Sequence, residues 1–229
     1  GGQILFGGAN DDDAGWSRLR FVDVGAARPP RVEPDTAYRD FFAPESVLTT
    51  DGRRVMWAWL TTLDGIEQRS VQSLPRELSL GDDGGLRIRP LTELASLRGE
   101  VALFRDVVAA PEAALHSAAA ATPITQLTDE ACEIRVVVDR PQTERKRFGL
   151  QLFADDGQPG LEIMVKPETG TLRLGETEAP FAVADLPAGE DLELRIYVDK
   201  YLVEVFANDR QAIATTFLDY RRASGLRLY

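Results

Sequence analysis

The sequence predicts an all-β protein, and three observations support this fold class. Apolar and polar residues alternate with a period of two in several short stretches, which is typical of strands with one buried face. No regular succession of strands and long helices is present, so sandwiches, barrels and propellers are favoured over a parallel sheet. Dipeptides that tolerate the positive φ of tight hairpins separate the stretches. These are Asp51-Gly52, Asp83-Gly84, Asp156-Gly157 and Asn208-Asp209.

The stretch RVMWAWL at residues 54–60 predicts a short strand in the first part of the chain. Turn signals at Asp51-Gly52 and Asp64-Gly65 bound it. It carries two of the three tryptophans, Trp57 and Trp59. Side chains two residues apart on a strand point to the same face, so both indoles should share one side of a sheet.

A short connecting helix is predicted at Thr92–Gly99, with Thr92 as its N-cap and Gly99 at its end. All three tryptophans and six of the 13 prolines lie at or before position 90, whereas the later strands alternate more regularly. We therefore place a domain boundary near residues 94–100. The expected domains are residues 1–94 and 95–229, with a linker helix at about 92–98.

Three later stretches each predict a strand with one face in a core, because their apolar residues alternate with mostly polar ones. The apolar positions are Ile134, Val136 and Val138, then Phe148, Leu150 and Leu152, then Leu192, Leu194, Ile196 and Val198.

Composition excludes several classes of partner. The 37 acidic residues outnumber the 26 basic ones, giving a net charge of -11, which opposes binding to phosphate backbones and anionic membranes. No apolar run approaches the roughly 20 residues that span a bilayer. The single cysteine, Cys132, cannot form an intramolecular disulfide, and the single histidine, His116, has no second histidine to complete a metal site. We expect no metal and no cofactor, and the compartment, cytoplasmic or secreted, stays open.

Five segments in order resemble the second half of the five-bladed propeller of glycoside hydrolase family 32, the β-fructosidases that include invertases, levanases and inulinases. In that family a D-F-Y-A-P segment, a G-R-R…W-G-W strand and an S-L-P-R-E-L strand follow each other at similar spacing. Residues 196–200 and 203–208 also resemble a hairpin of the family's C-terminal β-sandwich. The segments of this chain are DFFAPES at 40–46, DGRRVMWAW at 51–59, SLPREL at 73–78, DGGL at 83–86 and PLTEL at 90–94.

The resemblance implies a fold of the last propeller blades followed by a β-sandwich, and it implies two substrate-binding residues. Trp59 matches the second tryptophan of W-G-W, which lines the fructose subsite in the family. Phe42 falls at the tyrosine of D-F-Y-A-P. An indole supplies flat apolar area and an N–H donor to a sugar ring. For Trp59, a place in the core and a place in a pocket wall stay equally open, and Trp57 is expected to pack between blades.

The resemblance also implies that no catalytic residue lies in this chain. Retaining glycosidases need two carboxyl groups about 5 Å apart, and the family supplies its carboxylates from W-M-N-D-P-N-G, R-D-P and E-C motifs. For W-M-N-D-P-N-G, the chain offers only Asn10-Asp11, which lacks the proline and predicts a hairpin tip. For R-D-P, Phe41 follows Arg39-Asp40 in place of proline. For E-C, Ala131 separates Glu130 from Cys132. The catalytic carboxylates should therefore precede residue 1. Glu204, on the polar positions of an alternating strand, is expected to be solvated or to make an inter-domain contact.

Two hypotheses follow. The first is the C-terminal part of a hydrolase that cleaves β-fructofuranosyl linkages in sucrose, levan or inulin, completed by a missing N-terminal propeller half or a partner chain. The alternative is a non-catalytic carbohydrate-binding or assembly module built on the β-sandwich.

Overall fold

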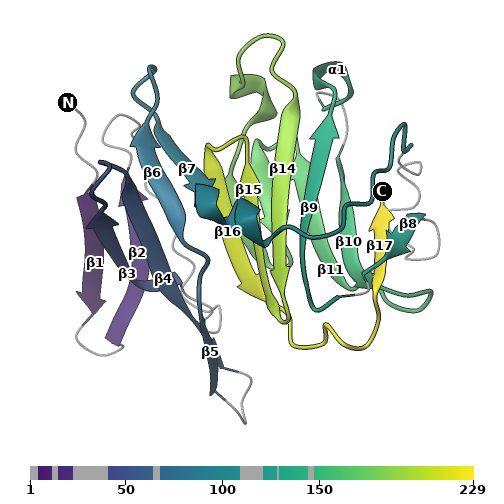
Figure 1. Ribbon diagram of the computed structural model, residues 1–229, viewed down its shortest axis with the longest axis horizontal. Helices are drawn as coiled ribbons and strands as arrows, with labels where there is room; N and C mark the ends of the chain where they lie inside the picture. The colour runs from purple at the N-terminus through teal and green to yellow at the C-terminus, as the bar shows by residue number, and fades with distance from the viewer. Residues whose placement is uncertain are drawn as a thin grey trace. The chain divides into compact units, whose positions relative to one another are not determined.

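The computed structural model describes residues 5–11, 15–22, 41–63, 68–108, 121–127, 129–143 and 147–229 (Figure 1). Contacts divide the chain into two compact units, Gly1–Glu93 and Leu94–Tyr229. The predicted all-β class is confirmed, since the helices in the described ranges are one α-helical turn, α1 (Arg140–Thr143), and two short 3-10 helices. None of these helices has the length and apolar character needed to cross a membrane.

Unit 1 consists of antiparallel sheets. β1 (Leu5–Asp11) pairs with β2 (Gly15–Val22), and Asn10 and Asp11 lie opposite Trp16 and Gly15, in agreement with the predicted hairpin. A second sheet has the order β3-β4-β6-β7, with β5 also paired to β4. Its strands are β3 (Phe41–Leu48), β4 (Arg54–Leu63), β5 (Gln68–Gln72), β6 (Arg76–Leu80) and β7 (Leu86–Pro90).

Two of the predicted turns in unit 1, at Asp51-Gly52 and Asp83-Gly84, are confirmed, whereas Asp64-Gly65 lies outside the described residues. Gly52 has a φ of 86° and its N–H donates to the Thr49 carbonyl at 3.0 Å. Gly84 has a φ of 76° and its N–H donates to the Gly81 carbonyl at 2.9 Å. Both conformations lie in the left-handed region that glycine adopts without steric cost.

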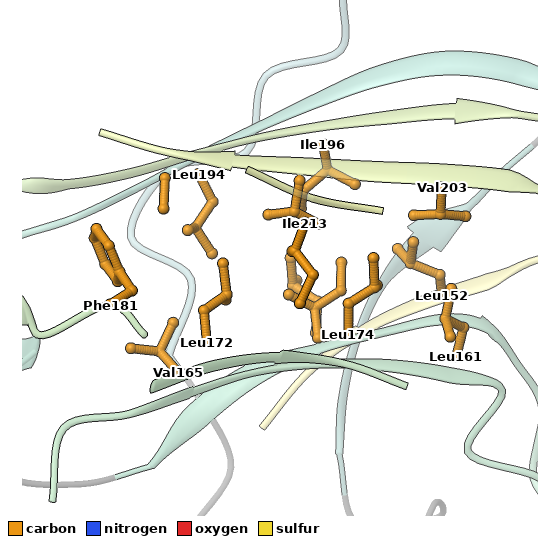
Figure 2. Close-up of a cluster of buried hydrophobic side chains, with 14 of the residues drawn as sticks. Leu152, Leu161, Val165, Leu172, Leu174, Phe181, Leu194, Ile196, Val203 and Ile213 are labelled. Atoms are coloured by element: carbon orange, nitrogen blue, oxygen red, sulfur yellow. The ribbon is translucent and has the colours of Figure 1, made fainter. Parts of the chain in front are cut away.

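Unit 2 contains two antiparallel sheets with the orders β13-β12-β11-β10-β17-β8 and β16-β15-β14-β9. Apolar side chains from both sheets meet in one buried cluster between them (Figure 2). The strands of the first sheet are β8 (Thr122–Gln126), β10 (Phe148–Ala154), β11 (Leu161–Lys166), β12 (Thr171–Leu174), β13 (Thr177–Pro180) and β17 (Gly225–Leu228). Those of the second are β9 (Ala131–Val138), β14 (Leu192–Asp199), β15 (Leu202–Ala207) and β16 (Gln211–Thr216).

The predicted strand at 192–198 is confirmed as β14, whose four apolar positions are at most 4% exposed. The predicted strand at 134–138 is β9, and it pairs with β14 along its whole length. Both strands place their alternating apolar residues in the shared cluster. Period-two patterning therefore identified the core face of this sheet correctly.

The strand at 148–152 exists as β10, but the prediction of a single buried face is wrong. Gln151, which alternates with Leu150 and Leu152, is 1% exposed, so the second face of β10 is also buried. The pairing register with β17 shifts between Gln151 and Ala154, and Phe153 has a φ of 58°. This bulge removes Phe153 from the alternation, and its ring stacks on Phe217 at a centroid distance of 5.6 Å.

The predicted connecting helix is the 3-10 helix η1 (Thr92–Leu97), which buries none of its residues. Thr92 is its first residue and does not act as the expected cap. Its backbone N–H and its hydroxyl both donate to the Glu77 carboxylate, at 3.2 and 2.9 Å. A side chain from β6, fifteen residues earlier in the chain, therefore satisfies this helix start.

Candidate functional site

The two tryptophans of β4 share one face of the strand, as predicted. Met56, Ala58 and Leu60, which alternate with them, are 0%, 2% and 5% exposed and form the packed face. Trp57 is half-buried, whereas Trp59 is 48% exposed. Trp59 therefore stands outside the buried core of the described residues and presents indole surface to solvent.

The pairing register places three sequence-distant residues in one row across three strands. Trp59 lies opposite Phe42 on β3 and opposite Gln72 on β5. A register shift between Phe42 and Glu45 then brings Glu45, and not Pro44, opposite Trp57. Pro44 is tolerated because β3 is the last strand on this side of the sheet and the shift is a bulge. Phe42 and Trp59 thus become direct neighbours along the backbone.

Ser73 holds the segment of β4 between the two tryptophans. Its hydroxyl accepts a hydrogen bond from the Ala58 N–H at 2.9 Å, and its own N–H donates to the Ala58 carbonyl at 2.8 Å. The side chain is 3% exposed. Sequence reasoning assigned no role to this serine, although it begins the SLPREL segment that carried part of the resemblance.

Glu77, in the same segment, is a buried carboxylate that accepts hydrogen bonds from several neighbouring segments of the chain. One oxygen accepts hydrogen bonds from Arg53 at 2.9 Å and from Thr92, and the other accepts two from Arg89 at 2.8 and 3.0 Å. Arg53 continues the network to Glu93 at 2.6 Å and to Asp51 at 2.8 Å. The carboxylate therefore ties the turn before β4, strand β7 and helix η1 to β6.

Electrostatics keep Glu77 ionised. Burial alone would raise the pKa of its carboxyl, but the hydrogen bonds from Arg89, Thr92 and Arg53 outweigh it and lower the pKa to about 2. A carboxylate held in this way cannot donate a proton near neutral pH. Glu77 lies opposite Val55 in the register, so its side chain is on the same face of the sheet as the two tryptophans, where it organises the surrounding chain.

Eight carboxyl groups have a lowered pKa, which is the opposite of what a glycosidase proton donor needs: those of Asp51, Glu77, Asp83, Glu93, Glu133, Glu168, Glu178 and Glu193. Glu130 forms an exposed ion pair with Arg221 at 2.6 Å, and Glu45 is exposed on β3. Among the described residues, no group of three His, Cys, Asp or Glu side chains could hold a metal ion. Asp40 and His116 lie outside the described residues.

Glu204 contradicts the expectation of a solvated side chain, since it is 1% exposed. It lies on β15, an interior strand between β14 and β16, with Leu202 and Phe206 buried on either side of it. Tyr197 is its register partner on β14, and the Tyr197 ring meets Phe206 edge to face at 5.9 Å. The alternation pattern alone could not reveal this burial, and the alternative expectation of an inter-domain contact stays a prediction.

Comparison with known proteins agrees with the resemblance. Residues 93–229 match the family model described as the C-terminal domain of glycosyl hydrolases family 32. The raffinose invertase of Escherichia coli is 33% identical over 76% of this chain and 35% of that protein. The levanase of Bacillus subtilis is 29% identical over 88% of this chain and 32% of that protein. The chain thus spans about a third of the length of the curated relatives it matches.

Solved structures show the same fold. The sucrose-6-phosphate hydrolase of Lactobacillus gasseri superposes with a TM-score of 0.61 over 82% of this chain and 38% of that chain, at 20% identity. The fructan 1-exohydrolase IIa of Cichorium intybus superposes with a TM-score of 0.59 over 84% of this chain and 45% of that chain, at 18% identity. Since the family model spans more than half of its residues and the invertase aligns with three quarters of it, the chain belongs to glycosyl hydrolase family 32.

Proposed function

We propose that the chain is the C-terminal part of a family 32 hydrolase that cleaves β-fructofuranosyl linkages. One observation carries this proposal: relatives named invertase and levanase align with most of the chain, while the chain spans about a third of their length. In this proposal unit 1 forms the last blades of a five-bladed propeller and unit 2 forms the β-sandwich. The nucleophile and the proton donor lie on polypeptide outside residues 1–229.

The role of this chain in the reaction is to supply one wall of the sugar site. Trp59 offers an exposed indole, and Phe42 is its direct backbone neighbour on β3. A flat ring of this kind packs against the apolar face of a sugar and excludes water from one side of it. Phe42 and Trp59 are therefore assigned to substrate binding.

The remaining residues of the site position that wall. Ser73 clamps β4 between the tryptophans, and Glu77 ties β6 to its surroundings through five hydrogen bonds. Rigid support matters because a small displacement of a binding residue lowers the rate of reaction at a distant bond. Neither residue exchanges protons with substrate in this proposal.

A complementation assay tests the proposal. The purified chain is assayed for fructose release from sucrose, levan and inulin, alone and after co-expression with the N-terminal half of the Escherichia coli raffinose invertase. We expect release only from the combination, with each half inactive by itself. Release by the chain alone would contradict the placement of the carboxylates. Sugar binding without turnover in both arrangements would support the alternative, a non-catalytic carbohydrate-binding module.

A further inference from the structure

Strand β9 is an edge of its sheet among the described strands of unit 2. Among the described strands it pairs only with β14, along eight residues that include no proline, glycine or lysine. Every second residue of such an edge strand directs its N–H and C=O groups away from its neighbour. An edge of this length is a template for another strand unless the protein guards it.

The other three sheet edges among the described strands of unit 2 carry features that hinder pairing with a further strand. β13 has only four residues and ends in Pro180. β8 contains Pro123, and its register with β17 is interrupted. β16 packs beside β12 and β13 of the facing sheet, and Gln211 at its start donates to the Pro180 carbonyl at 2.8 Å. β9 alone among the described edges lacks such a device.

The side chains of β9 are also incompletely covered. Its core-facing residues are only partly buried, whereas their partners on β14 are at most 4% exposed. On the opposite face, Val137 is 52% exposed. A further strand beside β9 would extend the apolar layer over these residues. The partly buried core-facing residues are Cys132, Ile134, Val136 and Val138.

The charges of β9 are self-complementary in one register. If a second β9 runs antiparallel with Ile134 opposite its own copy, Glu133 lies opposite Arg135 of the other copy, twice, and Ala131 lies opposite Val137. Centring the pair on Glu133 or on Arg135 would instead oppose two like charges directly, which is unfavourable. Centring it between residues would put core-facing positions opposite solvent-facing ones. Of the registers centred on Glu133, Ile134 or Arg135, only the one centred on Ile134 avoids the direct opposition of like charges.

We propose that two copies of the chain associate through their β9 strands, antiparallel and two-fold symmetric about Ile134, so that the two four-stranded sheets become one continuous sheet. Glu133 is already ordered on β9 within the single chain. Two hydrogen bonds from Arg98, at 2.6 and 2.8 Å, and one from the Tyr197 hydroxyl at 3.0 Å hold its carboxylate in place. Arg135, whose side chain is 62% exposed, is available to the partner beyond its own pair with Glu193.

Sedimentation velocity over a range of concentrations tests this interface. The wild-type chain should form a dimer, and Arg135→Glu should lower the association constant by roughly tenfold or more, because two-fold symmetry introduces two Glu–Glu oppositions at once. The matched control is Arg147→Glu, which makes the same charge change at an exposed arginine before β10 that pairs with Glu168. It should leave the dimer intact.

A disulfide test reports the register and does not depend on the charge variants. In a Cys132→Ala background, the double variant Ala131→Cys with Val137→Cys should form covalent dimers on mild oxidation, because these positions lie opposite each other across the two-fold axis. Each single variant should stay monomeric on a non-reducing gel.

Three results would overturn the proposal. One is a chain that stays monomeric while the β9 amides exchange slowly at every concentration, since the edge is then covered from within the chain. Another is a dimer that Arg135→Glu does not weaken. The third is a failure of the double cysteine variant to cross-link. None of these outcomes bears on fructoside hydrolysis, so the two proposals fail independently.

Discussion

Trp59 combines an exposed ring with a rigid backbone. It is 48% exposed, while the residues on either side of it, Ala58 and Leu60, are buried and anchor the strand. Stability therefore depends little on the indole, and its replacement should affect ligand binding more than folding. The row that it forms with Phe42 and Gln72 adds an aromatic and an amide residue at the neighbouring register positions.

In the complemented enzyme, Trp59→Ala should lower kcat/KM for fructosides roughly tenfold, since an aromatic contact contributes about 1.4 kcal/mol. Trp59→Phe should retain most of the activity. Leu80→Ala is the matched control, because Leu80 has the same exposed fraction of 48%. Steady-state kinetics and thermal melts of all three variants check this. A large fall in melting temperature for Trp59→Ala, or equal losses for Trp59→Ala and Leu80→Ala, would contradict a binding role.

Glu77 links stability to pH. Its folded pKa of about 2 lies below the ordinary value of 4.5, so the folded state prefers the ionised form. That stabilisation is fully present above about pH 5 and is lost as the pH falls through 4.5 towards 2. Arg53 and Arg89 are partly exposed, so screening limits the contribution to about 2 kcal/mol.

Glu77→Gln should therefore lower the free energy of unfolding by about 2 kcal/mol at pH 7 and by somewhat less than half of that at pH 3. Urea denaturation at the two pH values measures this difference. Glu45→Gln, an exposed glutamate on the same sheet, serves as the control and should change neither value. If Glu77→Gln lowers the free energy of unfolding by the same amount at pH 7 and at pH 3, the ionised carboxylate is not the source of the stabilisation.

At the scale of single elements, strand β10 depends on its close approach to β11. A Cβ on Gly149 would lie 1.9 Å from the Ile163 carbonyl oxygen, so only glycine fits there without moving the backbone. Gly149→Ala should lower the free energy of unfolding by about 1–3 kcal/mol, the usual cost of overpacking. Gly157→Ala is the matched control, because its nearest neighbour would be 3.5 Å away. Comparable urea midpoints for the two variants would refute the claim that the close approach of β10 to β11 requires glycine at position 149.

The hairpin between β15 and β16 shows how far turn composition can be trusted. Asn208 and Asp209 have φ values of 46° and 53°, which confirms the turn expected from these residue types without a glycine. The composition did not indicate that the Asn208 side chain also reaches the neighbouring loop. Its amide donates to Glu190 at 2.9 Å and its carbonyl accepts from the Glu193 N–H at 3.0 Å. Those partners depend on the packing of a separate segment.

For the whole molecule, the large apolar cluster of unit 2 is assembled within that unit. Its buried members run from Leu150 to Leu226, and both sheets contribute to it (Figure 2). A fragment of residues 94–229 should therefore fold alone and unfold in one cooperative transition. Near-UV circular dichroism and calorimetry of the fragment and of the full chain check this. Loss of the aromatic signal in the fragment would show that unit 2 needs unit 1 to fold.

The sequence by itself determined the all-β class, the main strands of unit 2, the hairpin turns and the family. Each of these depends on local information: side-chain alternation, residues that tolerate positive φ, and motifs that retain their order. The same information placed Trp57 and Trp59 on one face, because that relation holds within a single strand.

Only the tertiary structure decided which polar residues are buried and which strand edges stay open. Glu77 takes its partners from 12 to 24 residues away, and Glu204 is 1% exposed on an interior strand of its sheet. The second buried face of β10 and the position of β9 at an edge of the described strands likewise follow from the order of strands in their sheets. Alternation specifies that a strand has two faces, but what covers each face is set by contacts between residues far apart in the chain.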